Sequence, residues 1–504
     1  MASRISPVFV VSLVFLFASF AGHAIAQDIA DPHPGEALYA KICADCHDQP
    51  FYKAPSRTFL SALGPKNILA VLNNGAMREQ ASALTAIERI AVAEYLSEKS
   101  LADMVEPALP PACDADHSFD SSLVPTSRGF GVDLQNTRFQ PAKTGGLTAE
   151  NVHRLEVKWS FAYPNSIQAR SEPVYGGGGI YMGSQDGTVW ALDAQTGCLR
   201  WTFNATAEIR TGVSISQWSV DDSSVDPLIF FGDVIANVYA LSARTGKLRW
   251  KVRVDDHRDA TMTGTPSIYA GRLYVPVSSM EVVAAGNADY ECCTFRGALL
   301  SLDAATGELH WKSYTIDKPS KPTGKTINGT TIFAPSGAPI WSSPTIDSKR
   351  SQVYVGTGEN YSSPADGNSD AIIAFDLETG EKKWVAQQTQ NDAWNTACFL
   401  GFPGIDNSNC PEEDGPDYDF GSHPILVTLP GGSDILVGGQ KSGHAMGIDP
   451  DSGETLWRTP VGRGGIQGGV HFGIAAESDN LYIPINDLNF FNDEQRYKWE
   501  SPAK

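Results

Sequence analysis

The stretch ALDAQTGCLRW, residues 191–201, decides the fold because close variants of it return along the chain. Each copy holds the end of an extended run, a Thr-Gly or Ser-Gly turn, and a tryptophan four residues after the glycine. The other copies are ALSARTGKLRW (240–250), SLDAATGELHW (301–311), AFDLETGEKKW (374–384) and GIDPDSGETLW (447–457). A tight turn followed by a bulky ring lets one four-stranded sheet dock on the next, which predicts the repeated blades of a β-propeller.

The segments between the copies support a mainly β protein. Runs such as GRLYVPV and DNLYIPI alternate as strands do, and the tryptophans of the phrase recur roughly every 50 to 70 residues. The 47 glycines and 31 prolines suit many tight turns. A generic β-sandwich is the alternative, but unrelated strands would not share one phrase so often. We expect a propeller over residues 128–490, apparently incomplete, with about six blades present.

The N-terminus has the pattern of an export signal. Arg4 precedes a long apolar run, and Ala24 and Ala26 form a small-x-small cleavage pattern, which predicts a signal peptide over residues 1–26. The mature protein is then periplasmic and outside the membrane. An uncleaved membrane anchor is the alternative, because the apolar run is close to the shortest length that spans a bilayer.

The charge balance limits the partners. The formal net charge is −20, which disfavours nucleic acid and anionic membrane surfaces and suits a soluble protein or one with a cationic redox partner. Eight cysteines in an exported chain can form disulfides.

Two of those cysteines stand in a cofactor motif, CADCH, at residues 43–47. The thiols of Cys43 and Cys46 can add to the vinyl groups of a haem while His47 reaches the iron, which predicts one covalent haem c. A chance zinc half-site is the alternative. Met77 is the candidate sixth ligand, and methionine opposite histidine raises the reduction potential. A core methionine is the alternative for Met77.

The residues around the motif resemble the cytochrome c family over about residues 30–100. A short helix leads into CADCH, and a final helix follows Met77. We expect a small all-α cytochrome c domain at residues 28–106, followed by a proline-rich linker at 107–127. The residues of the final helix expected to pack on the haem are Leu84, Ile87, Ile90, Ala91 and Tyr95.

The repeated phrase resembles the tryptophan-docking motif of the quinoprotein alcohol dehydrogenases. That resemblance implies pyrroloquinoline quinone (PQQ) and a calcium ion on the axis of an eight-bladed propeller. A cytochrome c domain placed before the propeller is similar to the polyvinyl alcohol dehydrogenase branch. One departure is that the chain stops soon after DNLYIPIND, residues 479–487, and that residues 491–504 show no strand pattern. The sequence is therefore expected to be a fragment, a truncated gene product or an open ring.

The resemblance also implies where the metal binds. Calcium prefers carboxylate and amide oxygens. One ligand in the family is a glutamate before an Arg-Gly pair, which points to Glu281 ahead of Arg296. The second is the asparagine of a G-T-G-N turn, and GTGENYSSP offers Asn360, with Glu359 as an extra residue. Asn360 as a simple turn cap is the alternative.

The quinone contacts are implied in the same way. Trp341 matches the tryptophan that floors the quinone, and Lys441 matches the cation near its reactive carbonyls. Arg210 and Thr263 are weaker matches. The alternatives are a structural tryptophan and a solvated loop lysine.

The catalytic base departs from the family pattern. The family's proton acceptor closes a D-x-W-D phrase, whereas this chain reads NDAWN with Asn395 in that place. An amide cannot accept the proton as a carboxylate does, so the hypothesis is that Asp392 is the general base. Asn395 is then retained as a calcium or quinone contact. The alternative is that Asp392 only orients its loop.

The remaining cysteines admit several pairings. The resemblance implies a strained ring between the adjacent Cys292 and Cys293 against the face of the quinone. Cys398 with Cys410 would close a short loop and leave Cys113 with Cys198, but sequence does not determine connectivity.

The function predicted from these motifs is oxidation of a secondary or polymeric alcohol with PQQ, the electrons passing to the chain's own haem and then to a soluble cytochrome c. Two alternatives are an inactive relative and a propeller that serves as a binding scaffold. The fused haem disfavours a scaffold, which has no use for an electron acceptor.

Overall fold

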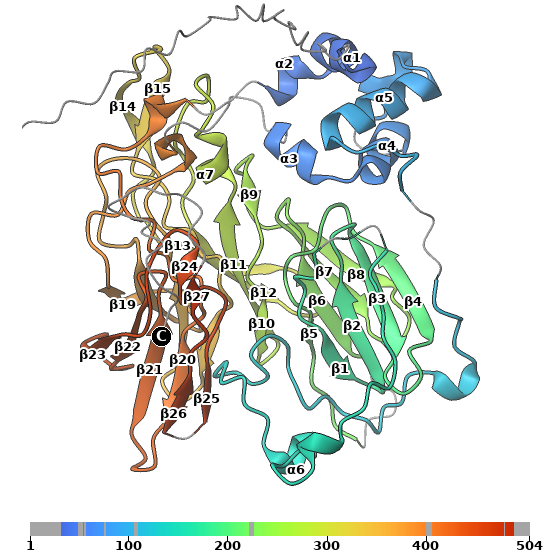
Figure 1. The fold of residues 1–504 in the computed structure, drawn as a ribbon, viewed down its shortest axis with the longest axis vertical. Helices are drawn as coiled ribbons and strands as arrows, with labels where there is room; N and C mark the ends of the chain where they lie inside the picture. Colours follow the sequence, from blue (N-terminus) through green and yellow to red (C-terminus); the bar gives the residue numbers. More distant parts are fainter. Residues whose placement is uncertain are drawn as a thin grey trace, which may run out of the picture.

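The computed structural model describes residues 32–48, 54, 57–74, 77–104, 109–164, 166, 168–220, 226–399, 406–477 and 479–487. The predicted export segment, residues 1–26, and the tail, residues 491–504, lie outside these ranges. Among the described residues, no helix has the length and apolar character that a membrane crossing requires. A small helical region and a large region of antiparallel sheets make up the described chain (Figure 1).

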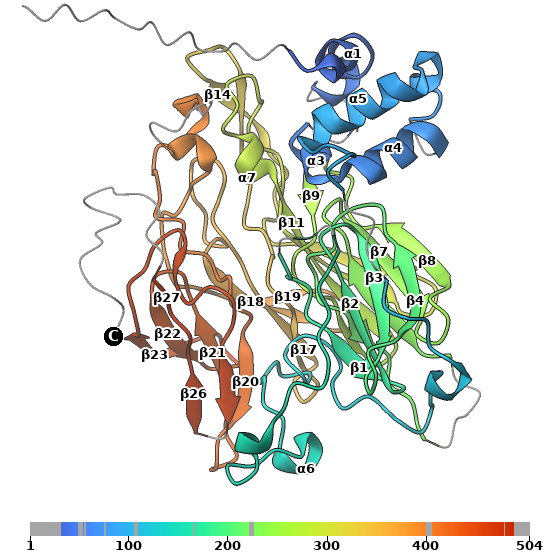
Figure 2. The same cartoon turned by 45° about the vertical axis from the view of Figure 1, so that its right-hand side comes forward.

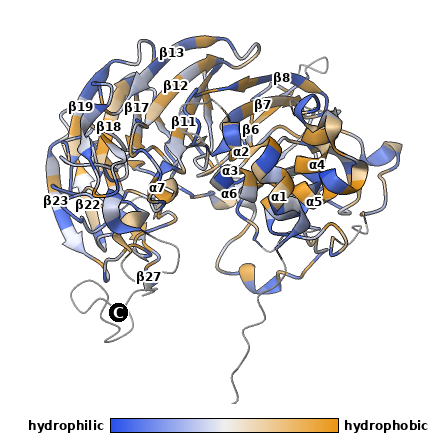
Figure 3. Ribbon diagram, turned by 90° about the horizontal axis from the view of Figure 1, so that it is seen from above, coloured by the Kyte–Doolittle hydropathy of each residue, from blue (hydrophilic) through white to orange (hydrophobic). Residues whose placement is uncertain are grey.

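The large region consists of sheets whose strands follow one another in chain order. Seen from above, the sheets succeed one another around an arc, as propeller blades do (Figure 3). Within the described residues, five sheets hold four consecutive strands each, β9 (Ala260–Thr261) adds to the third, and two short strand pairs follow. The predicted mainly β propeller is therefore confirmed.

The strands of the first two sheets are β1 (Val174–Gly176), β2 (Gly179–Gly183), β3 (Thr188–Asp193), β4 (Leu199–Asn204), β5 (Ser214–Ile215), β6 (Leu228–Gly232), β7 (Asn237–Ser242) and β8 (Leu248–Arg253). The third sheet has β10 (Ser267–Tyr269), β11 (Arg272–Ser279), β12 (Ala298–Asp303) and β13 (Leu309–Tyr314), and β14 (Lys321–Lys325) and β15 (Thr331–Ala334) form a separate hairpin. The last sheets have β16 (Thr345–Asp347), β17 (Gln352–Gly356), β18 (Ala371–Asp376), β19 (Lys382–Gln387), β20 (Ile425–Thr428), β21 (Asp434–Gly439), β22 (His444–Ile448) and β23 (Thr455–Pro460). The short pairs are β24 (Gly468–Gly469) with β27 (Asn486–Asp487) and β25 (Ala475–Glu477) with β26 (Asn480–Tyr482).

The tryptophans of the repeated phrase dock each sheet on the next. A Cβ on Gly246 would come within 2.6 Å of the ring of Trp201, whose indole N–H donates to the carbonyl of Ala243 at 3.0 Å. Only glycine leaves room for the ring at this turn. The same contact recurs between Trp250 and Gly307, Trp311 and Gly380, Trp384 and Gly453, and also between Trp159, which precedes the first phrase, and Gly197.

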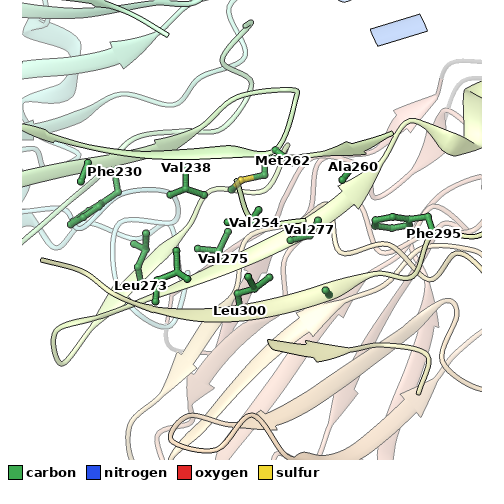
Figure 4. Packing of buried hydrophobic residues seen from close by; sticks show 14 of the residues in the cluster. Phe230, Val238, Val254, Ala260, Met262, Leu273, Val275, Val277, Phe295 and Leu300 are labelled. Atoms are coloured by element: carbon green, nitrogen blue, oxygen red, sulfur yellow. The ribbon is translucent and has the colours of Figure 1, made fainter. Parts of the chain in front are cut away.

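Apolar side chains fill the space between neighbouring sheets. Between the second and third sheets, Phe230 and Val238 pack with Leu273, Val275 and Leu300, all almost fully buried (Figure 4). Burying one such side chain contributes roughly 1.5–3 kcal/mol, so this packing holds adjacent sheets together.

The helical region has α1 (Pro34–Ile42), α2 (Ala44–His47), α3 (Arg57–Ala62), α4 (Pro65–Asn74), η1 (Gln80–Ala83) and α5 (Ala86–Ser97). Thr85 and Glu88 form a capping box that begins α5. A Cβ on Gly35 would come within 2.1 Å of the carbonyl oxygen of Ala91, so the glycine allows α1 and α5 to cross closely. Leu84 and Ala91 are buried as expected, but Ile87 is 79% exposed, so the prediction that it packs inward is wrong.

The helical region lies over the loops of the first two sheets (Figures 1 and 2). Ala207 and Val234 from those loops belong to the apolar cluster of the helices. The amide of Asn67 on α4 donates to the carbonyl of Asp186 at 3.3 Å. The two regions therefore share a packed interface.

An irregular segment, residues 128–138, ties distant sheets together. It accepts backbone hydrogen bonds from Ile215, Ile346, Leu426 and Ala476, which belong to four different sheets. The amide of the buried Asn136 donates to Thr345 Oγ1 at 2.7 Å. The remaining short helices are η2 (Ala115–His117), α6 (Ala142–Gly145), η3 (Val152–Arg154), α7 (Glu281–Ala284), η4 (Thr396–Cys398) and η5 (Asn407–Asn409).

Candidate functional site

The helical region encloses an apolar cavity of about 300 Å³. Cys43, Cys46, His47 and Met77, the four residues predicted to hold a haem, all line it. Cys43 stands between α1 and α2, Cys46 and His47 lie on α2, and Met77 stands just before η1. The other walls are mostly apolar, among them Leu60, Ile68, Leu72, Leu84, Val92 and Leu96.

The two thiols suit a covalent attachment. Neither Cys43 nor Cys46 belongs to a disulfide. Burial, followed by the charge of Asp48, raises the pKa of Cys43, so its thiol stays protonated and uncharged beside the apolar cavity. A c-type haem needs two thiols for attachment, an imidazole and a thioether as iron ligands, and an apolar cavity. The residues present supply all of these and fit that group.

A second cluster of polar groups is buried in the propeller. Ligand oxygens of Glu359, Asp417 and Asp419 lie within 4.8 Å of one another. The ammonium of Lys441 lies 2.5 Å from Asp417 and 3.3 Å from Asp419. The indole nitrogen of Trp341 donates to Asp419 at 3.0 Å. The loops after β17, before β20 and after β21 therefore meet here and bring Trp341 and Lys441 together.

This carboxylate cluster, defined as Glu359, Asp417 and Asp419, carries more negative charge than Lys441 compensates. Burial and the neighbouring charge of Asp419 raise the pKa of Glu359 well above its usual range, and burial does the same for Asp417. Burial alone would also raise the pKa of Asp419, but Lys441 and hydrogen bonds from Glu359 hold it below its ordinary value. Beside them, the carboxylate of the fully buried Asp370 has no hydrogen-bond partner among the described residues.

The excess charge can be neutralised by protons or by a cation. A hard divalent cation prefers several carboxylate oxygens at one point, which is what the carboxylate cluster offers. The positive charge of such an ion would lower the pKa of Glu359 and of Asp417 and keep both carboxylates ionised, although burial alone disfavours their negative charge. The donor set therefore fits calcium.

Glu281, the first predicted calcium ligand, lies in another network. It is fully buried at the start of α7, and its carboxylate accepts backbone N–H bonds from Thr294 and Phe295, both at 2.8 Å. Tyr290 donates to it at 3.1 Å, and His257 Nε2 lies 3.5 Å away. These contacts already use both carboxylate oxygens.

Asn360, the second predicted ligand, is likewise engaged in its own loop. Its amide nitrogen donates to Ser336 O at 3.0 Å, and its amide oxygen accepts the N–H of Asp366 at 2.7 Å. Glu359, expected from the sequence only as an extra residue of the turn, is the one whose carboxylate enters the cluster. The structure thus joins neither Glu281 nor the side chain of Asn360 to Trp341 and Lys441 by a hydrogen bond.

Comparisons with known proteins decide the family. Residues 128–398 match the PQQ family described as glucose/ethanol/alcohol dehydrogenase, beta-propeller domain. A polyvinylalcohol dehydrogenase of a Pseudomonas species is 38% identical over 483 residues, which are 93% of this chain and 74% of the relative. The chain belongs to the PQQ-dependent alcohol dehydrogenases.

Further relatives of this dehydrogenase agree with that result. A polyvinylalcohol dehydrogenase of Sphingopyxis sp. strain 113P3 is 34% identical over 93% of this chain and 72% of the relative. The solved quinohemoprotein alcohol dehydrogenase ADHIIG of Pseudomonas putida HK5 has a TM-score of 0.53 at 20% identity, over 75% of this chain and 60% of that one. The solved structure supports the propeller fold.

The predicted base of the dehydrogenase holds a loop. Both oxygens of the buried Asp392 accept backbone N–H groups, from Asp417 at 3.1 Å and Tyr418 at 2.8 Å. Burial raises the pKa of Asp392 to about 6. Asn395 donates to the carbonyls of Tyr361 and Asn409 and accepts the N–H of Ala397. Both side chains therefore fix loops by hydrogen bonds, and the role of Asp392 as general base stays a prediction.

The cysteines of the dehydrogenase pair as adjacent Cys292–Cys293, as Cys398–Cys410 and as the long-range Cys113–Cys198. The Sγ of Cys292 lies 4.0 Å from the amide nitrogen of Asn395. Within the part of the chain that the structure describes, no hydrogen bond joins the vicinal pair to Trp341, so its place against a quinone stays a prediction.

The two weaker matches differ in their surroundings. Thr263 donates to the carbonyl of Trp341 at 3.2 Å and so supports the predicted floor of the quinone site. Arg210 pairs with Glu208 at 3.0 Å. His471, which no motif indicated, packs on Trp341 with ring centroids 5.6 Å apart. Asp417 and Asp419 were missed as well, although the D-Y-D alternation of PDYDF was a signal that two carboxylates share one face.

Proposed function

We propose that this dehydrogenase oxidises a secondary or polymeric alcohol in the periplasm with bound PQQ and calcium and passes the electrons to a haem c held by its own helical region. One observation carries the proposal: the same chain brings Cys43, Cys46, His47 and Met77 around one cavity and joins Trp341, Asp419 and Lys441 in a second buried site. The polymeric substrate is suggested by the relatives, which are polyvinylalcohol dehydrogenases.

The propeller residues would share the work at the quinone. PQQ when bound supplies a two-electron acceptor whose carbonyls a cation polarises. Trp341 would support the flat ring, and Lys441 would stabilise negative charge on its oxygens. The carboxylate cluster would hold the calcium ion, with Glu359 in the position expected of Asn360.

The proton of the alcohol needs a carboxylate that stays ionised. Lys441 keeps the pKa of Asp419 low despite burial, so Asp419 is an anion at neutral pH. Asp392 is the predicted base, but backbone N–H groups occupy both of its oxygens. Both oxygens of Asp419 also accept hydrogen bonds, from the N–H of Glu359 and from the indole of Trp341. What favours Asp419 as the proton acceptor is its direct contact with Trp341 and Lys441, the two residues expected to hold the quinone. Among the described residues, no hydrogen bond joins Asp392 to either of them, and it holds the loop that carries Asp417.

The four residues at the haem cavity would have two tasks, covalent attachment of the haem and ligation of its iron. A bound haem supplies a one-electron acceptor. Cys43 and Cys46 would hold it covalently, His47 and Met77 would ligate the iron, and the apolar walls would exclude water. Oxidation of an alcohol to a carbonyl releases two electrons, so the haem must be reoxidised twice per turnover, and a soluble ferric cytochrome c is the acceptor we propose.

The proposal is tested with purified protein that carries covalent haem and is loaded with PQQ and Ca²⁺. Adding a secondary alcohol, or polyvinyl alcohol, is expected to raise the α-band of reduced haem. The same protein without PQQ is the control and is expected to show no change. Absence of haem reduction with quinone demonstrably bound would remove the enzyme proposal. Recovery of a mature N-terminus near residue 27 from a periplasmic extract tests the location.

A further inference from the structure

A hydrogen bond joins the propeller to the residue predicted to ligate the haem iron. Arg258 donates from Nη2 to the carbonyl oxygen of His47 at 2.9 Å. The side chain of Arg258 is only 9% exposed, and its Nε lies 3.7 Å from the carboxylate of Asp259. His47 is itself buried. A guanidinium is thus held against the main chain of the ligand, where little water screens its charge.

Buried rings lead from this contact back toward the carboxylate cluster. His257, the neighbour of Arg258, meets Phe295 edge to face with centroids 5.5 Å apart. Phe295 in turn stacks with Tyr361 at 6.3 Å, and Tyr361 lies two positions after Glu359. The loop of residues 257–259 therefore contacts His47, which lines the haem cavity, on one side and Phe295, which stacks on Tyr361, on the other.

We propose that Arg258 is a positioning residue for the haem, holding the His47 segment against the propeller and raising the reduction potential of the iron. A fixed cation stabilises an added electron, and it does so more strongly where burial lowers the dielectric screening. Hydrogen bonds and charges around a ligand are among the features that set a haem potential. The inference rests on the proposed function only in placing a haem in the cavity. It does not require that the propeller oxidises an alcohol.

The test uses the full chain with covalent haem and without quinone or alcohol. The ratio of reduced to oxidised haem is read from the α-band at one fixed applied potential. Arg258→Gln is expected to lower this ratio by roughly three- to tenfold, the effect of one lost charge-assisted hydrogen bond. Arg258→Lys, which keeps the charge, is expected to recover most of it. Asp259→Asn removes the anion beside Arg258 and is expected to shift the ratio in the opposite direction.

Arg249→Gln is the matched control, because Arg249 lies on β8, is 48% exposed and pairs with Asp226. It is expected to leave the ratio unchanged. An unchanged ratio in Arg258→Gln with full haem content overturns the proposal, and so does an equal fall in Arg249→Gln. If Arg258→Gln does not fold, Asp259→Asn decides, because a ratio that stays constant or falls there contradicts the proposal. A chain that fails to oxidise alcohols still gives each of these results, so the two proposals fail separately.

Discussion

The indole nitrogen of Trp341 donates a 3.0 Å hydrogen bond to the carboxylate of Asp419, a residue that stands far along the chain and in no motif recognised from the sequence. Lys441 lies 3.3 Å from the same carboxylate. One carboxylate therefore links the predicted floor of the quinone site to its predicted cation. Asp419 is therefore a candidate proton acceptor beside Asp392, and substitution of each residue distinguishes the two hypotheses.

Replacing Asp419 by Asn is expected to lower kcat by about 10²-fold or more, the usual worth of a positioned base. Asp392→Asn is the matched comparison. The amide introduced at position 392 would place a donor NH2 group against the backbone N–H of Asp417 or Tyr418, where Asp392 offers an acceptor. We therefore expect Asp392→Asn to reduce the free energy of unfolding by about 1–3 kcal/mol and to have a smaller effect on kcat. Steady-state kinetics and thermal unfolding measure both. If Asp419→Asn kept a kcat near that of the unsubstituted enzyme and Asp392→Asn had no measurable kcat, Asp392 would be the base.

Calcium is expected to stabilise the protein through Glu359. At a free Ca²⁺ concentration of 100 times Kd, binding adds about 2.7 kcal/mol to the free energy of unfolding. Glu359→Gln is expected to lose most of this gain, measured as the rise in Tm on adding CaCl₂ after chelation. Glu281→Gln is the control, expected to lower Tm in both conditions and to keep the calcium response. The reverse pattern would return the metal to Glu281.

Replacing Met77 by Ala is expected to leave the haem covalently attached and to lower its reduction potential. The thioether bonds depend on Cys43 and Cys46, whereas a methionine ligand raises the potential. Haem-stained gels and spectroelectrochemical titration report the two properties. Met104→Ala, outside the cavity lining, is the control. A potential that does not change in Met77→Ala would move the sixth ligand to another residue.

The buried His423 is expected to make the propeller sensitive to acid. Burial, aided by the charge of Arg138, lowers the pKa of His423 to about 3. Below about pH 6.5 the imidazole therefore binds a proton in the unfolded chain but not in the folded chain. The contribution of neutral His423 to the free energy of unfolding is therefore fully present above about pH 6.5. It is lost as the pH falls toward 3, by about 1.4 kcal/mol per pH unit.

His423→Gln is expected to flatten this pH dependence of Tm, and the exposed His153→Gln is expected to leave it unchanged. Since His423 Nε2 lies 3.3 Å from the carbonyl of Asn136, glutamine can retain that contact. An equally steep loss of Tm in His423→Gln between pH 6.5 and 4.5 would assign the acid sensitivity to other groups.

Much of the fold could be predicted because it repeats. A phrase with a turn glycine and a tryptophan encodes one docking contact, and the copies encode one blade each, as the Trp201–Gly246 pair shows. Trp159 was missed because it makes the same contact outside any copy of the phrase. Ile87 was misplaced because a helical period does not say which side of a short helix meets solvent.

The sequence by itself determined the propeller class and the cavity residues from Cys43 to His47, because these follow from repetition and from local spacing. The resemblance to the quinoprotein alcohol dehydrogenases supplied the candidates Trp341 and Lys441. Only the tertiary structure showed that the side chain of Glu359, and not that of Asn360, enters the carboxylate cluster, since neighbouring residues in extended backbone point to opposite sides and one position of register exchanges them. It alone brought Asp417 and Asp419 to Lys441, and Arg258 to His47. Those contacts join loops far apart in the chain, and packing of whole sheets and helices, which no local pattern records, sets the distances between them.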